Sequence, residues 1–447
     1  MLDLLLKNGR LVNEKGIWSG NIGIKEGKIV ALNSLSGDQT ARKVIDLKDK
    51  IVTPGCIDAH VHIPVEEDSP RGNFFTEGRA ALAGGTTMVV DFLKGKERSL
   101  PETFAMNKEI IDELAAVDYG FHAVILHEHD LEDIAALHDQ GVVSFKHIMA
   151  DCNGLTGLHT GFQYYSFQEI ARVGSIATVH AESEEIQAYI IKKYKEENQK
   201  RPIDHARSRT ILSEVEAISR SILLAEEAGT RLHVFHISSG RGAQLVKEAR
   251  QRGLPVTGET CPHYLYFTRE DVKEQGPFLI MNPSLKFAAD RQQIWRLLRQ
   301  GMVDMVTSDH YAPLKKDKES GWQDCWSVEG GVPGIETRTL LLAAREDLSW
   351  SDFVRMTSFQ PARIFGLYPR KGTIEIGADA DLVVWQKEER ELQPETLKQT
   401  ADWTPFAGLK LKYVPYRVYL RGKQVYKEGE YTGKAGDGNY IPGKGGR

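Results

Sequence analysis

Two histidines near the start of the chain have a type and a spacing that suit metal binding. His60 and His62 are two residues apart in a predicted strand, so their side chains point to the same face. Two neighbouring imidazoles can bind one divalent cation. The spacing alone is weak evidence, because His127 and His129 share it. That second pair lies between a predicted strand and a helix that Asp130 is expected to cap.

Three more residues with suitable chemistry end predicted apolar strands. His180 follows the apolar residues 177–179, His236 follows residues 234–235, and Asp309 closes a third strand. Each has an ordinary alternative, namely a hydrogen-bonded core histidine or a helix-capping aspartate. Together they place nitrogen and oxygen ligands at several strand ends, which favours a metal site. Asp309 could also accept a proton from an attacking water.

Lys146 stands in an unusual place for a lysine. It lies within the apolar run from Val142 to Met149, where an ammonium ion loses its hydration. One alternative is a side chain that extends to carry its charge out of the apolar layer. A buried amine with a lowered pKa can instead take up carbon dioxide and form a carbamate, whose two oxygens can bridge two metal ions. With the four imidazoles and Asp309, Lys146 predicts a two-metal site that activates water.

The elements that carry these residues must bring them together. Short apolar strands alternate with helix-length amphipathic segments. Eight strand-helix units in series are typical of a (β/α)8 barrel, whose chemistry lies at the C-terminal ends of the strands. The predicted strands span residues 56–62, 87–92, 119–126, 142–149, 176–181, 232–237, 255–265 and 302–310, with helices that include 102–117, 131–140, 212–228 and 291–299.

The two ends of the chain differ in character from the middle. Short strands separated by glycine turns fill the first fifty residues and return after Gly372. We expect residues 1–53 and 372–447 to form one small β-sandwich domain, with 433–447 as a loosely held tail. Residues 54–371 would form the barrel. The predicted fold class is therefore α/β, a TIM barrel with an attached β-sandwich.

Composition limits the partners and the compartment. The chain has 447 residues, of which 41% are hydrophobic and 27% charged, as is ordinary for a folded protein. A formal net charge of −5 gives no field that would gather nucleic acid. No signal segment and no apolar run of membrane-spanning length is found. Four scattered cysteines fit reduced thiols. We expect a cytoplasmic protein that binds a small neutral substrate, and neither nucleic acid nor membrane.

Seven short motifs surround the candidate residues. They are Pro54 to His62, Ala83 to Thr87, Ser144 to Lys146, Val179 to Glu182, His236 to Ser239, Glu259 to Tyr264 and Ser308 to His310. As an ordered set they resemble the amidohydrolase superfamily, in particular its branch of hydantoinases, dihydropyrimidinases and allantoinases. The similarity runs nearly end to end.

The resemblance implies a role for each candidate residue. One metal ion would be bound by His60, His62, carboxylated Lys146 and Asp309, and the other by Lys146, His180 and His236. Asp309 would be the catalytic general base and proton shuttle. The cofactors implied are two divalent metal ions per subunit, zinc or else manganese, cobalt or nickel, and carbon dioxide held as the Lys146 carbamate. Relatives are commonly homotetramers, so a homo-oligomer is expected.

Within this branch, Asp317 to Trp322 is similar to L-hydantoinases. The resemblance implies hydrolysis of a carbon–nitrogen bond in a cyclic amide, converting a 5-substituted hydantoin to an N-carbamoyl amino acid. Allantoinase is an alternative because Glu214 to Ile218 resembles its sequence, and dihydropyrimidinase follows. Dihydroorotase is disfavoured because Pro64 replaces its usual arginine. An inactive interaction scaffold, like the dihydropyrimidinase-related proteins, is disfavoured because all six candidate positions are present.

One departure from the family pattern concerns the oxyanion. Dihydropyrimidinases carry a tyrosine that is thought to stabilise it, and Asp151 stands at that place here. Asn153, Tyr164 and Tyr165 are candidates to replace it, although each has an ordinary explanation as a loop or packing residue.

A second departure concerns the substrate ring. Relatives hold the ring amide largely through backbone groups at a serine and an asparagine, and this chain has Asn282 and Gly330 at those places. We therefore expect Asn282, Gly330 and Asn153 to contact the substrate, while the changed side chains leave the identity of the ring open.

Overall fold

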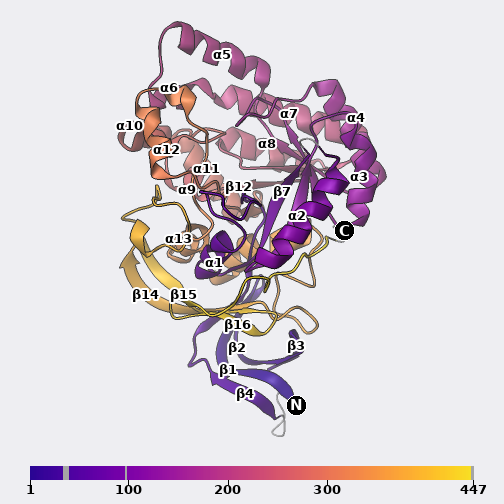
Figure 1. Cartoon of the computed structure of the whole chain (residues 1–447), viewed down its shortest axis with the longest axis vertical. Helices are drawn as coiled ribbons and strands as arrows, with labels where there is room; N and C mark the ends of the chain where they lie inside the picture. Colours follow the sequence, from indigo (N-terminus) through magenta and orange to yellow (C-terminus); the bar gives the residue numbers. More distant parts are fainter. Residues whose placement is uncertain (34–39, 96–97, 444–447) are drawn as a thin grey trace.

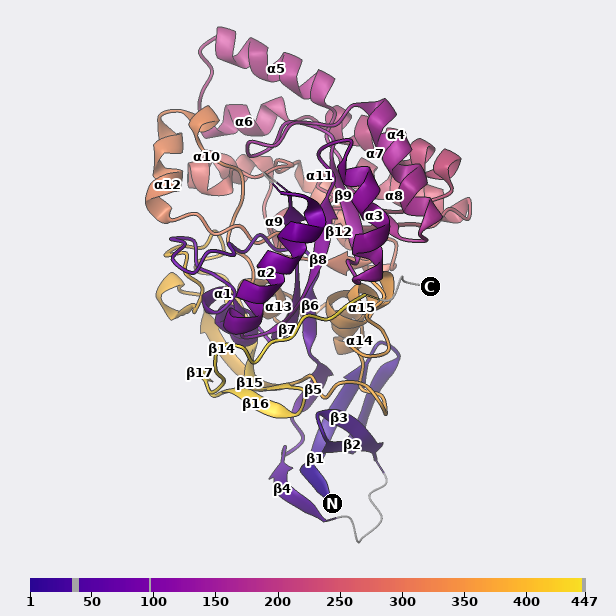
Figure 2. The same cartoon turned by 45° about the vertical axis from the view of Figure 1, so that its right-hand side comes forward.

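A computed structural model describes residues 1–33, 40–95 and 98–443. It contains a large unit of parallel strands surrounded by helices and a smaller β-rich unit at one end (Figure 1). The N-terminal strands and the strands late in the sequence lie together in the smaller unit, as both views show (Figure 2). Among the described helices, none has the length and apolar character needed to cross a bilayer.

Eight parallel strands form the barrel and neighbour one another in sequence order. The first and last strands meet through a parallel bridge between Val61 and His310, where the His62 N–H donates to the His310 carbonyl at 2.8 Å. The predicted TIM barrel is therefore confirmed. Its strands are β6 (Cys56–Asp58), β7 (Thr86–Lys94), β8 (Asp118–Val124), β9 (Ser144–Ile148), β10 (Ile176–His180), β11 (Arg231–Val234), β12 (Val256–Thr260) and β13 (Met305–Val306).

Helices cover the outer face of the barrel. Because its strands are thereby buried on both faces, they appear in the sequence as continuous apolar runs. Every residue of β8, β9 and β10 is buried, as expected for parallel strands covered on both faces. The helices are α1 (Thr76–Ala83), α2 (Leu100–Leu114), α3 (Asp130–Asp139), α4 (Thr160–Arg172), α5 (Glu184–Glu196), α6 (Pro202–Ser208), α7 (Ile211–Ala228), α8 (Gly240–Gln251), α9 (Pro262–Tyr266), α10 (Val272–Gln275), α11 (Ala288–Arg299), α12 (Lys315–Glu319), α13 (Thr337–Ala343), α14 (Trp350–Val354) and α15 (Gln360–Ile364).

Local sequence signals set the ends of these helices. The Ser99 side chain accepts from the Glu102 N–H at the start of α2, and Glu102 bonds back to Ser99, which is a capping box. Helix α7 ends at Gly229, whose φ of +67° suits glycine. The predicted strand 255–265 is shorter than expected, because Pro262 begins α9, and proline is favoured in the first turn of a helix.

The smaller unit is built from both ends of the chain, as predicted. Its strands are joined in one nine-stranded sheet rather than in two separate sheets. Strand β1 pairs in parallel with β4 and β5, and the other pairings are antiparallel. The strands are β1 (Leu2–Asn13), β2 (Gly16–Lys25), β3 (Lys28–Leu32), β4 (Ala41–Asp46), β5 (Ile51–Pro54), β14 (Leu382–Glu391), β15 (Lys410–Leu420), β16 (Lys423–Lys427) and β17 (Glu430–Tyr431).

The glycine-rich end of the chain differs from the expected loose tail. The Tyr119 N–H donates to the Asn439 carbonyl at 3.0 Å, and the Ile441 N–H donates back to Tyr119 at 2.8 Å. Ile441 is fully buried. Strand β8 thus offers backbone partners to residues 439–441, and one apolar side chain anchors them to the barrel. Residues 444–447, which also belong to the predicted tail, lie outside the described residues.

Candidate metal centre

Three of the predicted ligands converge where the barrel closes. One carboxylate oxygen, Asp309 Oδ1, lies 3.2 Å from Nε2 of His60 and 3.2 Å from Nε2 of His62. The ligand atoms of all three residues lie within 4.8 Å of one another. Two imidazole nitrogens and a carboxylate at this separation are a donor set that suits a divalent cation.

A second pair of imidazoles faces the same interior. Nδ1 of His180 lies 3.0 Å from Nε2 of His236, and the His236 ring is 5.3 Å from that of His60. Burial lowers the pKa of both His180 and His236. Neutral imidazoles carry a free lone pair, so this pair offers two nitrogen donors to one ion.

Lys146 is buried among aromatic rings beside the first set of ligands. Its Nζ lies 3.5 Å from Nε2 of His60, 3.9 Å from the centre of the Phe92 ring and 5.1 Å from that of Phe235. Burial lowers the pKa of Lys146 to about 8, although the Asp309 charge opposes this. The amine therefore loses its proton more readily than that of an ordinary lysine, and about one tenth of it is unprotonated at pH 7. The unprotonated amine is the form that reacts with carbon dioxide.

Two buried glutamates orient the histidines from behind. Oε1 of Glu259 lies 2.6 Å from Nδ1 of His60, and Oε2 of Glu182 lies 3.0 Å from Nε2 of His180. Glu182 also pairs with Arg209. Burial would raise the pKa of each glutamate, but the charges of His60 and Arg209 outweigh it and hold both pKa values at about 2. Each carboxylate fixes which ring nitrogen faces the centre.

The sequence predictions did not include Glu182 or Glu259 as site residues. Glu182 follows His180 by two residues at a strand end, so the spacing that marked His60 and His62 was also a signal here. Glu259 is the last residue but one of β12, the one strand from β9 to β13 without a predicted ligand. Its role becomes visible only when the barrel brings it against His60.

The backbone at two predicted ligands is strained. His236 has φ of +37° and Asp309 has φ of +48°, a region that costs side-chain-bearing residues about 1 to 3 kcal/mol and concentrates at functional sites. Burial would raise the pKa of Asp309, but the charge of His60 and hydrogen bonds from His60 and His62 hold it well below its ordinary value. Asp309 is therefore ionised, as a metal ligand must be.

A cavity of about 410 Å³ opens onto these groups. It is lined by five of the six predicted ligands, and His60 lies buried directly behind them. The predicted substrate residues Asn153, Asn282 and Gly330 line the same cavity. Its wall also includes residues that were not predicted, namely Arg71, Lys94, Cys152, Tyr311 and Glu329.

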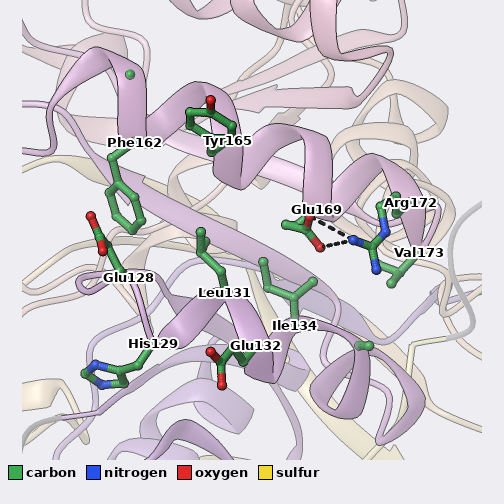
Figure 3. Close-up of a pocket in the computed structure, with 12 residues that line it drawn as sticks. Glu128, His129, Leu131, Glu132, Ile134, Phe162, Tyr165, Glu169, Arg172 and Val173 are labelled. Carbon is green, nitrogen blue, oxygen red and sulfur yellow. Dashed lines mark hydrogen bonds and ion pairs between the residues drawn. The ribbon is translucent and has the colours of Figure 1, made fainter.

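A larger hollow of about 1090 Å³ lies between α3 and α4 on the outer face (Figure 3). His129 and Tyr165 line it, and Tyr165 is 66% exposed. The second histidine pair is therefore separate from the candidate ligands, and Tyr165 does not line the metal cavity. Among the described residues that line the metal cavity, Asn153 is the only one of the three oxyanion candidates, since Tyr164 and Tyr165 are not in its wall. Asp151 instead accepts a hydrogen bond from the Gly157 N–H at 2.9 Å.

Comparisons with known proteins agree with this geometry. The model of the Amidohydrolase family matches residues 51–425. The chain is 33% identical to a D-hydantoinase of Ralstonia pickettii over 98% of both chains, and 33% identical to an allantoinase of Solibacter usitatus over 98% of this chain and 96% of that one. A solved structure of an L-hydantoinase (dihydropyrimidinase) from Arthrobacter aurescens superposes with a TM-score of 0.94 at 32% identity, covering 99% of this chain and 100% of that one. The protein belongs to the amidohydrolase family.

Proposed function

We propose that the protein is a binuclear-metal hydrolase that opens the ring of a 5-substituted hydantoin and releases an N-carbamoyl amino acid. The observation that carries the proposal is the convergence of His60, His62 and Asp309, the facing pair His180 and His236, and Lys146 around one cavity. Full-length similarity to proteins named D- and L-hydantoinase supports the substrate class.

The donor set fits two divalent ions. We assign His60, His62 and Asp309 to one ion and His180 and His236 to the other, with Lys146 shared between them as a carboxylated side chain. Such ions, with zinc as our first choice, polarise the scissile carbonyl and lower the pKa of water. The pKa of about 8 for the Lys146 amine supports carboxylation.

Asp309 is the proposed proton shuttle. Its carboxylate lies at the centre of the ligand set and lines the cavity, so it can take a proton from the attacking water and deliver it to the leaving ring nitrogen. Glu182 and Glu259 do not line the cavity and act by holding the histidine rings.

Two other ring substrates are alternatives. Allantoin is supported by similarity to the allantoinase of Solibacter usitatus. A dihydropyrimidine is supported by similarity to the Arthrobacter aurescens enzyme, which is named both an L-hydantoinase and a dihydropyrimidinase. A panel of initial rates with D- and L-5-substituted hydantoins, allantoin, dihydrouracil and dihydroorotate separates them. We expect the highest kcat/KM with a hydantoin. Fast opening of allantoin with no turnover of any hydantoin would overturn the choice.

A non-catalytic scaffold makes a different prediction. It would hold no stoichiometric metal and open no ring in the same panel. The family membership and the preserved donor set favour the enzyme.

The remaining proposals concern organisation. We propose residues 1–53 and 372–447 as one domain and 54–371 as the other, a homotetrameric assembly by similarity to relatives, and a cytoplasmic location. Light scattering on the purified protein tests the assembly, and a monomer at micromolar concentration would contradict it.

A further inference from the structure

Gly330 lines the metal cavity, and a side-chain amide already pairs with both its backbone N–H and its backbone carbonyl. Asn153 Nδ2 donates to the Gly330 carbonyl at 2.9 Å. The Gly330 N–H donates to Asn153 Oδ1 at 3.1 Å. One primary amide thus pairs with the N–H and the carbonyl of a single residue, as an amide-containing ring would.

Asn282 completes this contact and explains the glycine. Its Nδ2 lies 3.4 Å from Asn153 Oδ1, and a Cβ added to Gly330 would lie 2.5 Å from the same Nδ2. The side chain of Asn282 therefore fills the space that a side chain at position 330 would need. The three predicted substrate residues form one hydrogen-bonded cluster on the cavity wall.

The backbone around Gly330 is held rigidly from behind. Lys318 is fully buried, and its ammonium donates to the carbonyls of Ile280 at 2.9 Å, Glu329 at 3.2 Å and Gly331 at 3.0 Å. The Gly331 N–H also donates to Ile280 at 3.0 Å. The amide edge of Gly330 is therefore a fixed feature of the cavity.

Asn153 belongs to an exposed loop between β9 and α4. Its side chain is exposed, and its φ of +47° places it at a left-handed turn. Cys152 and Leu155 exchange backbone hydrogen bonds across the turn at 3.0 and 2.9 Å. The contact of this loop with Gly330 depends on the Asn153 side chain at the tip of the turn. Because the backbone at Gly330 is fixed, the loop is the part that can move away.

We propose that the Asn153 amide competes with the substrate's ring amide for the backbone N–H and carbonyl of Gly330. The inference rests on the proposed function, because a hydantoin or related ring presents an N–H and a carbonyl with the same pairing capacity. In the unliganded enzyme, the Asn153 amide occupies the N–H and the carbonyl of Gly330. Substrate binding exchanges the Asn153 hydrogen bonds for its own, and the turn at residues 152–155 moves aside.

Such a competitor lowers apparent affinity without contacting the bound ring. When the binding-competent state is a fraction of the population, the apparent dissociation constant rises by the inverse of that fraction. Two neutral hydrogen bonds, each contributing about a fivefold factor to an equilibrium constant, together correspond to about a thirtyfold effect at most. Removing the Asn153 amide is therefore expected to tighten ring binding, whereas removing a substrate contact would weaken it.

The test measures the dissociation constant of 5,5-dimethylhydantoin by calorimetry on the metal-loaded enzyme. Asn153→Gly keeps the left-handed backbone accessible and removes the amide. Asn153→Asp keeps the size and the acceptor for the Gly330 N–H. It replaces the donor with a carboxylate oxygen that repels the Gly330 carbonyl, so it removes only part of the contact. Thr156→Ala, an exposed position in the same loop, is the matched control. We expect up to about thirtyfold tighter binding in Asn153→Gly, a smaller gain in Asn153→Asp and no change in the control. Weaker or unchanged binding in Asn153→Gly, or no binding by any form, would overturn the proposal.

Hydrogen exchange gives a readout that does not depend on turnover. The Gly330 amide should exchange more slowly in the unliganded wild type and Thr156→Ala than in Asn153→Gly. Equal rates would contradict the contact. Failure of the proposed function would instead appear as no ring opening in the substrate panel while the ordering of dissociation constants and exchange rates persists.

Discussion

Two clusters of ligand-type residues, one partly and one fully buried, lie at opposite ends of the barrel strands, and they differ in what balances their charge. His60, His62 and Asp309 lie at the C-terminal ends, while Asp118, Asp379 and Asp381 lie beside the smaller unit. In both clusters, the ligand atoms lie within 4.8 Å of one another. The aspartate cluster contains its own cation, because Lys371 Nζ lies 2.9 Å from Asp379 and 2.6 Å from Asp381, and it also pairs with Asp118.

The two buried lysines make the contrast clear. Burial would lower the pKa of Lys371, but the charges of Asp381, Asp118 and Asp379 raise it above its ordinary value. Burial instead dominates at Lys146 and lowers its pKa to about 8. Proximity of acidic groups therefore does not identify a metal site. A metal site also needs donors that the protein's own cations leave unneutralised, and the His60 cluster meets that condition.

The largest expected effect is at Lys146. Lys146→Ala removes the proposed bridging carbamate, so we expect the second-order rate constant kcat/KM to fall by at least about ten-thousandfold, with loss of metal. Added acetate or propionate should restore part of both. Steady-state rates and elemental analysis measure the two effects. Unchanged metal content in this variant would refute the bridge.

At the other cluster, the change should affect stability instead. Lys371→Met removes the buried cation that the three aspartates share, while Arg421 still pairs with Asp118 and Lys28 and Arg370 still pair with Asp379. We expect the free energy of unfolding to fall by about 3 kcal/mol. Urea denaturation of wild type and variant measures the difference. Activity per folded molecule should stay within about twofold of wild type, and a specific loss of activity would show that the two clusters are not independent.

The glutamates behind the histidines should have graded, selective effects. Glu259→Gln is expected to lower the affinity for the metal ion at the His60 side by about 10- to 100-fold. Glu182→Gln is expected to lower the affinity for the ion at the His180 side by a similar factor. Competition with a chelating dye gives both affinities. Equal weakening of both ions by either single change would argue against separate assignments.

The smallest expected effect is acid sensitivity from Asp379 in the aspartate cluster. Burial raises the pKa of the neighbouring Asp381, so the contribution of that residue has the opposite sign. Burial would raise the pKa of Asp379, but the Lys371 charge and the Lys28 hydrogen bond hold it at about 2. Because this lies below the ordinary value of 3.8, the stability it contributes is complete above about pH 4 and is lost as the pH falls toward 2. We expect a loss on the order of 1 to 2 kcal/mol across that range. Urea titrations at pH 5, 4 and 3 should show it in wild type and a flatter profile in Lys371→Met.

Much of the fold could be predicted because local signals and global arrangement agree. Strands covered on both faces appear in the sequence as apolar runs, and each of the eight predicted runs overlaps a barrel strand. The ends of the strands and the C-terminal end of the chain were harder to predict. Pro262 stops β12 early, and the backbone partners that hold residues 439–441 are on β8, far away in sequence.

The candidate ligands were predictable because each lies at or near the C-terminal end of a strand, and parallel strands of a barrel end on one face. Residues that act through another side chain were not. Glu259 contacts His60 from 199 residues away, and Asn153 contacts Gly330 across 177 residues. Such contacts depend on how loops and neighbouring strands meet, which spacing within a single segment does not encode.

The most direct test of the central claim is the metal content of the purified, metal-supplemented protein after removal of free ions. Elemental analysis should give two divalent ions per chain in wild type and in Lys371→Met, and clearly fewer in Lys146→Ala. Wild-type protein that holds no stoichiometric metal would contradict the account. Equal metal in wild type and Lys146→Ala would contradict the part assigned to Lys146.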